Sequence, residues 1–253
     1  MIIDAPSHDD IPLLRSLWKE AFGDGEKFLD AFFSTAFSPD RARCAKENGD
    51  ILAMLYWFDC EYEGEHVAYL YAVATAKVCR GRGICTSLMK NAHRHLKEKG
   101  YTGALLVPGT GELFAFYEKL GYKTACYVNE FSALAVNGDF YIEKINKDKY
   151  AELRRSFLPD GSVLQEKANI DFLNFQASFY TGDGFLLAAR REGKMLFGAE
   201  LLGNAEKAPQ IAGALGSEVG KFRTPGSEKP FAMYLPLAEK EKKPPTYFGL
   251  AFD

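Results

Sequence analysis

The chain has 253 residues and a mass of 28.2 kDa, more than the roughly 100 to 150 residues of a typical domain, so two domains are expected. Its apolar content of 47% and charged content of 26% are ordinary for a soluble globular protein, and a net charge of −3 gives no support to nucleic-acid binding and fits a cationic substrate. No segment approaches the ~18 apolar residues of a membrane span, and the N-terminus has no signal-peptide pattern, so we expect a cytoplasmic protein with no membrane partner.

The cysteines do not form a recognisable framework. Their number is odd and none stands in CxxC spacing, which argues against both disulfides and a zinc site. We therefore expect no metal, and reduced thiols packed as small core residues: Cys44, Cys60, Cys79, Cys85 and Cys126.

Two amphipathic helices are predicted at the N-terminus. Ser7 is a typical helix cap with Asp10 three positions later, and Gly23 is a typical helix end. Apolar residues between them recur on one helical face. A second apolar helix is predicted over residues 28–37, before Pro39. Most aromatic side chains of this pair are interpreted as core packing.

Three β-strands follow, separated by two tight turns. Residues 42–46 and 51–58 flank Asn48-Gly49, the strongest short hairpin signal in the sequence. A second turn at Glu63-Gly64 leads into an apolar strand over residues 66–75. These elements predict an antiparallel arrangement.

A short basic loop joins this strand to the next helix. Its sequence is Arg80-Gly81-Arg82-Gly83-Ile84-Cys85, and apolar residues then recur every four positions until Gly100. The first N–H groups of a helix have no intrahelical partner, so they and the helix dipole favour a diphosphate, which glycines let the backbone approach. The alternative interpretation is an ordinary turn into a helix, because a glycine-rich loop alone is a weak signal.

Two motifs resemble those of the GNAT superfamily of acyl-CoA-dependent N-acetyltransferases. Residues 80–85 are similar to its R-x-x-G-x-G/A pyrophosphate loop, and residues 116–122, Phe-Tyr-Glu-Lys-Leu-Gly-Tyr, are similar to its F-Y-x-K-x-G-F segment. A strand at 104–107, a helix at 112–120 and a strand at 122–131 complete the order of elements that the superfamily implies. The resemblance implies an α/β (α+β) fold with a central mixed, mostly antiparallel, splayed sheet flanked by helices, and a catalytic acetyl-CoA-binding domain over residues 1–135.

The second half resembles a shortened copy of the first. Three segments resemble segments of the first half at an offset of roughly 140 residues, as expected of an internal duplication. They are residues 141–150, 170–173 and 186–201. No R-x-x-G-x-G follows Gly216. We interpret residues 136–253 as a smaller, truncated, degenerate GNAT-like domain without a cofactor site, which completes the acceptor pocket or forms a homodimer. This tandem arrangement is similar to that of enhanced-intracellular-survival type acetyltransferases.

The resemblance also implies roles for single residues. Backbone N–H groups at the end of the strand face the thioester and pantetheine of acetyl-CoA, the co-substrate, and the loop binds its pyrophosphate. Tyr117 is the general acid for the leaving thiolate. The position of Thr110, where the superfamily often has Asn, lies on the cofactor side. The predicted cofactor-binding residues are Val73, Ala74, Thr75, Arg80, Gly81, Arg82, Gly83, Ile84, Cys85, Thr86 and Thr110.

The general base is left open. The strand over residues 67–73 has no carboxylate, and the glutamates at the preceding turn, 61, 63 and 65, are interpreted mainly as solvated charges. His66 is the imidazole nearest this strand, whereas the histidines at 8, 93 and 95 are interpreted as helix-surface residues. The tail over residues 246–253 is too apolar for a free end and finishes at Asp253, whose terminal carboxylate is a catalytic candidate by the same resemblance.

The leading hypothesis is an N-acetyltransferase that moves an acetyl group from acetyl-CoA to a primary amine of a small molecule or peptide, by direct attack in a ternary complex. The alternative is a non-catalytic acyl-CoA-binding sensor or interaction protein, suggested by the missing strand carboxylate. A scaffold acting only through protein contacts leaves the intact loop unexplained. The acceptor amine is not predicted, because acceptor pockets in this fold are built from variable loops.

Overall fold

The computed structural model describes residues 1–238 and 243–252, which form two compact units. The first unit comprises Met1–Lys123 and Tyr234–Lys243, and the second comprises Thr124–Met233 and Pro244–Asp253. The chain therefore passes from one unit to the other three times. None of the described helices is long and apolar enough to cross a membrane.

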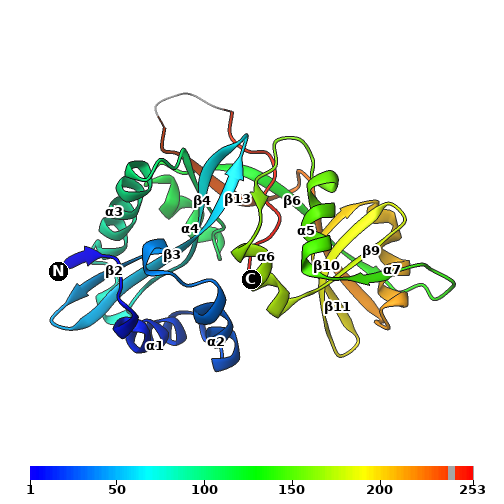
Figure 1. The fold of residues 1–253 in the computed structure, drawn as a ribbon, viewed down its shortest axis with the longest axis horizontal. Helices are drawn as coiled ribbons and strands as arrows, with labels where there is room; N and C mark the ends of the chain where they lie inside the picture. Colours follow the sequence, from blue (N-terminus) through cyan, green and yellow to red (C-terminus); the bar gives the residue numbers. More distant parts are fainter. Residues whose placement is uncertain (239–242, 253) are drawn as a thin grey trace. The chain divides into compact units, whose positions relative to one another are not determined.

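The first unit is a sheet with helices on both faces. Its strands run in the order β1-β2-β3-β4-β5, followed by the end of β13, with antiparallel pairs up to β4 and a parallel β4–β5 pair. Helix α1 packs on β3 and β4, and α3 packs on β2, β3 and β4 on the other side of the sheet (Figure 1). The bounds are β1 (Ile2–Asp4), α1 (Ile11–Phe22), α2 (Glu26–Thr35), β2 (Ala42–Glu47), β3 (Asp50–Tyr62), β4 (Glu65–Thr75), α3 (Ile84–Glu98), β5 (Gly103–Leu106), α4 (Gly111–Glu118) and β13 (Lys229–Pro236).

The predicted turns are present, and the predicted cap Ser7 begins a 3₁₀ turn at His8–Asp10 that leads into α1, whose own N-cap is Asp10. Ser7 donates its backbone N–H and its hydroxyl to Asp10 at 2.6 and 2.8 Å, and α1 ends at Gly23 with φ +78°. Helix α2 begins two residues earlier than predicted because Gly25 supplies its N-cap. It also ends two residues earlier than predicted, because the N–H of Phe37 donates to the carbonyl of Phe32, five residues before it, and no longer follows the α-helical pattern. The Asn48-Gly49 turn has positive φ at both residues, as a two-residue hairpin requires.

Strand β4 contains an irregularity that the sequence did not reveal. Tyr71 pairs with Tyr56 and Ala74 with Met54, so two residues of β4 lie opposite one residue of β3. This is a β-bulge, and Ala72 within it has φ +49°, an uncommon value for a side chain other than glycine. The parallel pairing with β5 stops at Tyr69, six residues before β4 ends. Strand β5 itself ends at Leu106, so the last six residues of β4 extend beyond the residues paired with β5.

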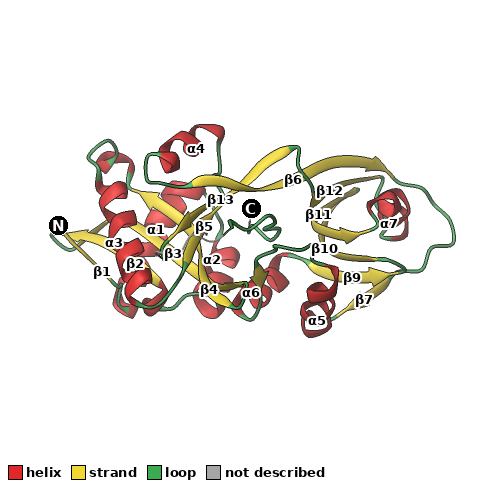
Figure 2. Cartoon of the chain, turned by 90° about the horizontal axis from the view of Figure 1, so that it is seen from above, coloured by secondary structure: helices red, strands yellow, loops and turns green. Residues whose placement is uncertain are grey.

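The second unit repeats the order and pairing of these elements. Its sheet contains the first part of β13 and then β6-β12-β11-β10-β9-β7 (Figure 2), with antiparallel pairs from β7 to β11 and a parallel β11–β12 pair. The bounds are β6 (Lys123–Leu134), β7 (Glu143–Ile145), α5 (Lys147–Phe157), β8 (Leu164–Gln165), α6 (Ala168–Gln176), β9 (Ser178–Gly182), β10 (Phe185–Glu192), β11 (Met195–Gly203), α7 (Ala208–Ala214) and β12 (Val219–Pro225).

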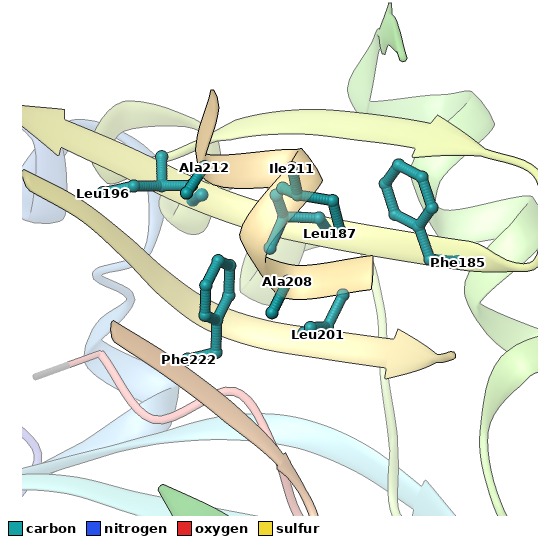
Figure 3. Packing of buried hydrophobic residues seen from close by; sticks show 9 residues of the cluster. Phe185, Leu187, Leu196, Leu201, Ala208, Ile211, Ala212 and Phe222 are labelled. Atoms are coloured by element: carbon teal, nitrogen blue, oxygen red, sulfur yellow. The ribbon is translucent and has the colours of Figure 1, made fainter. Parts of the chain in front are cut away.

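One apolar core of this unit lies between α7 and the sheet. Figure 3 shows Ile211 and Ala208 of α7 directed at Leu187 and Leu201 of the strands, with Phe222 beside them. All of these side chains are at most 2% exposed. The opposite face of the sheet receives α5 near β9, β10 and β11.

On that opposite face, a buried ion pair joins α5, β11 and the tail. Arg154 donates from Nε and Nη2 to the two carboxylate oxygens of Glu200 at 2.7 and 2.9 Å, and the hydroxyls of Tyr150 and Tyr247 donate to the same carboxylate at 2.8 and 2.9 Å. Arg154 and Glu200 are 1% and 0% exposed. The described tail thus packs within the second unit, where Gln165 also exchanges two hydrogen bonds with the backbone of Leu250.

Candidate active site

The loop between β4 and α3 presents open backbone. After one turn of 3₁₀ helix at Lys77–Cys79, Gly81 and Gly83 adopt φ values of +75° and +73°. A Cβ placed on either glycine would meet no atom within 4 Å, so it would project into open space. Glycine is needed at both positions because other residues seldom adopt this conformation.

Helix α3 begins without a side-chain cap. Gly83 is its N-cap residue and has no side chain to accept from the first turn. The N–H groups of Ile84, Cys85 and Thr86 therefore point out of the helix start without intrahelical acceptors. With fifteen residues, α3 has a full helix dipole, whose positive end lies here. This geometry fits a diphosphate group of the kind that acetyl-CoA carries.

The two loop arginines are partly used to shape the loop. Arg80 donates from Nε to the carbonyl of Thr75 at 3.2 Å, which closes the loop across five residues. Arg82 lies 3.9 Å from a carboxylate oxygen of Glu47 and donates to the sulfur of Cys79 at 3.7 Å. The carboxylate of Glu20 on α1 accepts the N–H of Lys77 at 2.6 Å and so anchors the start of the loop. Both arginines are exposed and keep further N–H groups for an anion.

The end of β4 lies next to this loop. Val73 belongs to the bulge and is followed by Ala74 and Thr75, and all three lie beyond the residues of β4 that pair with β5. The hydroxyl oxygen of Thr75 is buried and has no well-formed hydrogen bond among the described residues. It lies near the thiol of Cys85. Burial raises the pKa of that thiol, and the Thr75 hydroxyl opposes the rise.

Tyr117 lies close to the same thiol although it comes from α4. Its side chain is buried, with 6% exposed. Burial, and then the nearby Cys85, raise the pKa of Tyr117 above its usual value, so its hydroxyl holds its proton at neutral pH. The structure therefore brings together Thr75, Cys85 and Tyr117, which the sequence placed in three separate segments.

Behind Tyr117 is a buried tyrosine–histidine pair. The ring of Tyr122 meets that of Tyr117 edge-on with centroids 5.9 Å apart, and its hydroxyl is 2.8 Å from Nε2 of His93 on α3. Burial lowers the pKa of His93 to about 4, so the imidazole is neutral at pH 7. The interpretation of His93 as a surface residue is wrong. It lies on the side of α3 that packs on Tyr122, between the buried residues Met89 and Leu96.

The remaining candidates lie elsewhere. Thr110 is exposed at the N-terminus of α4 and does not cap it with its side chain. His66 and the three turn glutamates lie at the far end of β4, and His66 precedes Val73 by seven residues of extended chain, about 20 Å or more. The structure does not bring them to the loop. Asp253 lies outside the described residues.

On its other face, the end of β4 meets an aromatic cluster. Trp18 of α1 contacts Phe32, Tyr56 and Tyr71 with ring centroids 4.6 to 5.8 Å apart. Trp18, Phe32 and Tyr56 are at most 2% exposed, which confirms core packing for them. Phe33 is only half-buried and Phe22 is 47% exposed, so the edge of the cluster reaches the surface.

Known structures share this architecture. The chain superimposes on a GCN5-related N-acetyltransferase from Anabaena variabilis with a TM-score of 0.73 over 94% of this chain and 73% of that one, at 13% identity. The chain has the GNAT fold. Residues 3–125 match the family model of the Acetyltransferase (GNAT) domain, which contains the loop and Tyr117.

Two further GNAT-fold structures are similar over both units. A GCN5-related N-acetyltransferase from Kribbella flavida has a TM-score of 0.69 at 14% identity, with 92% of this chain and 70% of that one covered. Eis1 from Mycobacterium abscessus has a TM-score of 0.67 at 12% identity, with 94% and 74% covered. At these identities the likeness establishes the fold alone. No curated protein matches the sequence.

The sequence analysis missed three contributors to the site. Glu20 and His93 had no motif around them, since each acts on a segment far away in the sequence. The bulge at Ala72 had no signal either, because its positive φ is imposed by strand pairing and not by a glycine or asparagine. The four cysteines other than Cys85 are buried, as predicted for small core residues.

Proposed function

We propose that this protein is an acetyl-CoA-dependent N-acetyltransferase, which transfers the acetyl group directly to a primary amine of a small molecule or peptide in a ternary complex. The observation that carries the proposal is the combination of an uncapped α3, an open two-glycine loop and a protonated tyrosine beside them. Bound acetyl-CoA would supply the activated acyl group and a thiolate leaving group.

The first unit has a donor for each part of the co-substrate. The N–H groups of residues 81–86, with Arg80 and Arg82, would bind the diphosphate. The backbone of Val73, Ala74 and Thr75, which lies beyond the residues that pair with β5, would align with the pantetheine arm and polarise the thioester carbonyl. The unpartnered Thr75 hydroxyl would gain an acceptor on the same ligand.

Tyr117 would donate the proton that the leaving thiolate requires. Its hydroxyl keeps that proton at neutral pH and lies in a buried environment, where a charge-neutralising transfer is favoured. Tyr122, held by neutral His93, packs edge-on against it and restricts its ring. In this proposal Tyr117 is the catalytic residue, and Tyr122 and His93 position it.

For the general base we propose Asp253. The residues before it pack within the second unit: Tyr247, Leu250 and Phe252 are at most 5% exposed. The turn glutamates and His66 are weaker candidates because β4 holds them at its opposite end. We propose that the second unit is a degenerate GNAT-like copy that does not itself bind acetyl-CoA.

The test is release of free thiol from acetyl-CoA in the presence of a panel of amines, with mass spectrometry of the acceptor. We expect amine-dependent thiol release. Tight CoA binding by calorimetry without thiol release for any amine would instead support the sensor, and no CoA binding would contradict both functions.

Tyr117→Phe tests the catalytic assignment. We expect kcat to fall by ~10²-fold or more, the scale of a lost general acid, with little change in the KM for acetyl-CoA. Tyr101→Phe is the control, because Tyr101 is a partly buried tyrosine that donates to Asp59 and belongs to neither motif. Wild-type turnover in Tyr117→Phe would show that the tyrosine only packs.

A further inference from the structure

The second unit contains a cavity that has no place in the proposed acetyl transfer. It has a volume of about 370 Å³, within the range of small-ligand sites, and is lined by residues of β6, β10, β11 and β12. It opens on the sheet face opposite α7. Neighbouring residues of a strand point to opposite faces of a sheet. Four side chains stand next to residues of the α7 core in their strands and therefore point away from that core: Arg190, Phe197, Lys221 and Arg223.

Strand register places the cationic side chains in one row across the sheet. Arg190 pairs with Phe197, Phe197 with Lys221, and Lys221 with Ser132. The guanidinium of Arg190 lies 5.1 Å from the centre of the Phe197 ring and the ammonium of Lys221 lies 5.9 Å from it. Cation–π attraction to the Phe197 ring thus stabilises two cations that would otherwise repel each other.

The next row adds a third cation. Arg223 pairs across the strands with Glu130, to which its Nε donates at 3.1 Å, and its side chain is only 13% exposed. Glu130 also pairs with Lys229. These two hydrogen bonds outweigh the effect of burial and lower the pKa of Glu130, which stays ionised.

One cation at the cavity has no carboxylate partner among the described residues. Arg190 pairs with Glu192, and Glu130 is shared by Arg223 and Lys229, but Lys221 forms no ion pair with any residue that the structure describes. The ammonium of Lys221 therefore keeps donors for an anion.

We propose that this cavity binds a small anionic ligand, with a carboxylate or phosphate group held between Arg190 and Lys221 and an apolar part resting on Phe197, beside Gly198 and Ala199 of the cavity lining. The site is separate from the loop of the first unit, and the proposal does not depend on the acetyl-transfer assignment. Charge-assisted hydrogen bonds from an arginine and a lysine are the usual way to hold either anion.

The experiment is an NMR titration of the full chain with phenyl phosphate, benzoate and neutral benzamide, which share one ring and differ in charge. We expect at least one anion to bind ~10-fold or more tightly than benzamide, the scale of a charge-assisted hydrogen bond. The preferred anion identifies the class of group. Equal affinity for benzamide, or no saturable binding of either anion, would overturn the proposal.

Matched double variants locate the site. Arg190→Gln with Lys221→Gln should weaken binding of the anion by ~10-fold or more. Lys144→Gln with Arg155→Gln removes one lysine and one paired arginine elsewhere on the same unit and should leave the affinity within about twofold. Equal losses in both variants would show a non-specific charge effect. Circular dichroism melting of each variant confirms that it is folded before the titration.

Discussion

The start of α3 in the first unit and the start of α7 in the second unit are the same point of one repeated topology, but their polar groups are treated differently. In the first unit the loop leaves N–H groups open, with Gly83 as the cap. In the second, a 3₁₀ turn at Ala205–Lys207 leads into α7, and Asn204 caps that turn by accepting the N–H of Glu206 at 3.0 Å. Pro209 removes one donor from the first turn of α7, and this helix has seven residues instead of fifteen. A phosphate site costs stability because its donors must stay unsatisfied until the ligand arrives.

The units also differ at the strand next to that helix. Each strand has a β-bulge, between Tyr71 and Ala74 in β4 and at Ala199 in β11. The residue that resumes pairing is Ala74 in the first unit and Glu200 in the second. Ala74 carries only a methyl side chain, whereas the Glu200 carboxylate is enclosed by Arg154, Tyr150 and Tyr247. The second unit thus places a buried polar network at the position where the first unit has a small side chain.

The largest expected effect is reversal of charge at the open loop. Arg80→Glu with Arg82→Glu should lower CoA affinity by ~10³-fold or more, since two anions would replace two cations at the diphosphate. Lys90→Glu with Arg94→Glu makes the same change in net charge on the exposed side of α3 and should change the affinity little. Calorimetry measures both. Equal affinities in the two variants would remove the basis of the loop assignment.

The second largest effect concerns the closed unit. Arg154→Met leaves the Glu200 carboxylate buried without its cation and should cost about 3–5 kcal/mol of unfolding free energy. Arg155→Met removes the neighbouring, exposed pair with Glu166 and should cost about 0–1 kcal/mol. Urea unfolding compares them. Similar small costs would mean that the buried network does not hold the tail and β11 together.

The third effect is a pH dependence that should arise in the first unit. The folded pKa of His93, about 4, is below its unfolded value of about 6.5, so the unfolded chain takes up a proton first as the pH falls. Stability should therefore be complete above pH 6.5 and decrease by at most about 2 kcal/mol by pH 5.

His93→Gln isolates this effect, because glutamine does not titrate and can still bond to Tyr122. Its loss of stability between pH 7 and pH 5 should be smaller than that of the wild type. His8→Gln, at an exposed position, should lose as much stability between pH 7 and pH 5 as the wild type does. An unchanged acid profile in His93→Gln would show that other groups cause it.

The smallest expected effect separates backbone strain from ligand binding. Gly83 and Gly184 have φ values of +73° and +75°, and neither has an atom within 4 Å of an added Cβ. Alanine at either position should cost about 1–2 kcal/mol of stability. Only Gly83→Ala should also weaken CoA binding, by ~10-fold, because only its Cβ would stand in the diphosphate site. Equal CoA affinity in the two variants would place the ligand elsewhere.

The local elements of the first unit could be predicted from sequence because short-range chemistry decides them. The cap at Ser7, the Asn48-Gly49 turn, the basic glycine loop and the end of α3 at Gly100 all depend on residues within a few positions of one another. The splay of β4 from β5 was expected only through the resemblance. No periodicity or turn signal in the sequence marks where that pairing stops.

Long-range packing decided the rest. Three contacts join segments that are between about 10 and 50 residues apart in the sequence, and no local pattern records such contacts. They are the convergence of Thr75, Cys85 and Tyr117, the burial of His93 under Tyr122, and the enclosure of Glu200 by the tail. Strand exchange is the clearest case. The chain returns at β13 to complete the edge of the first unit's sheet, because an edge strand is stabilised by whichever segment supplies its missing hydrogen bonds, however distant that segment is in the sequence.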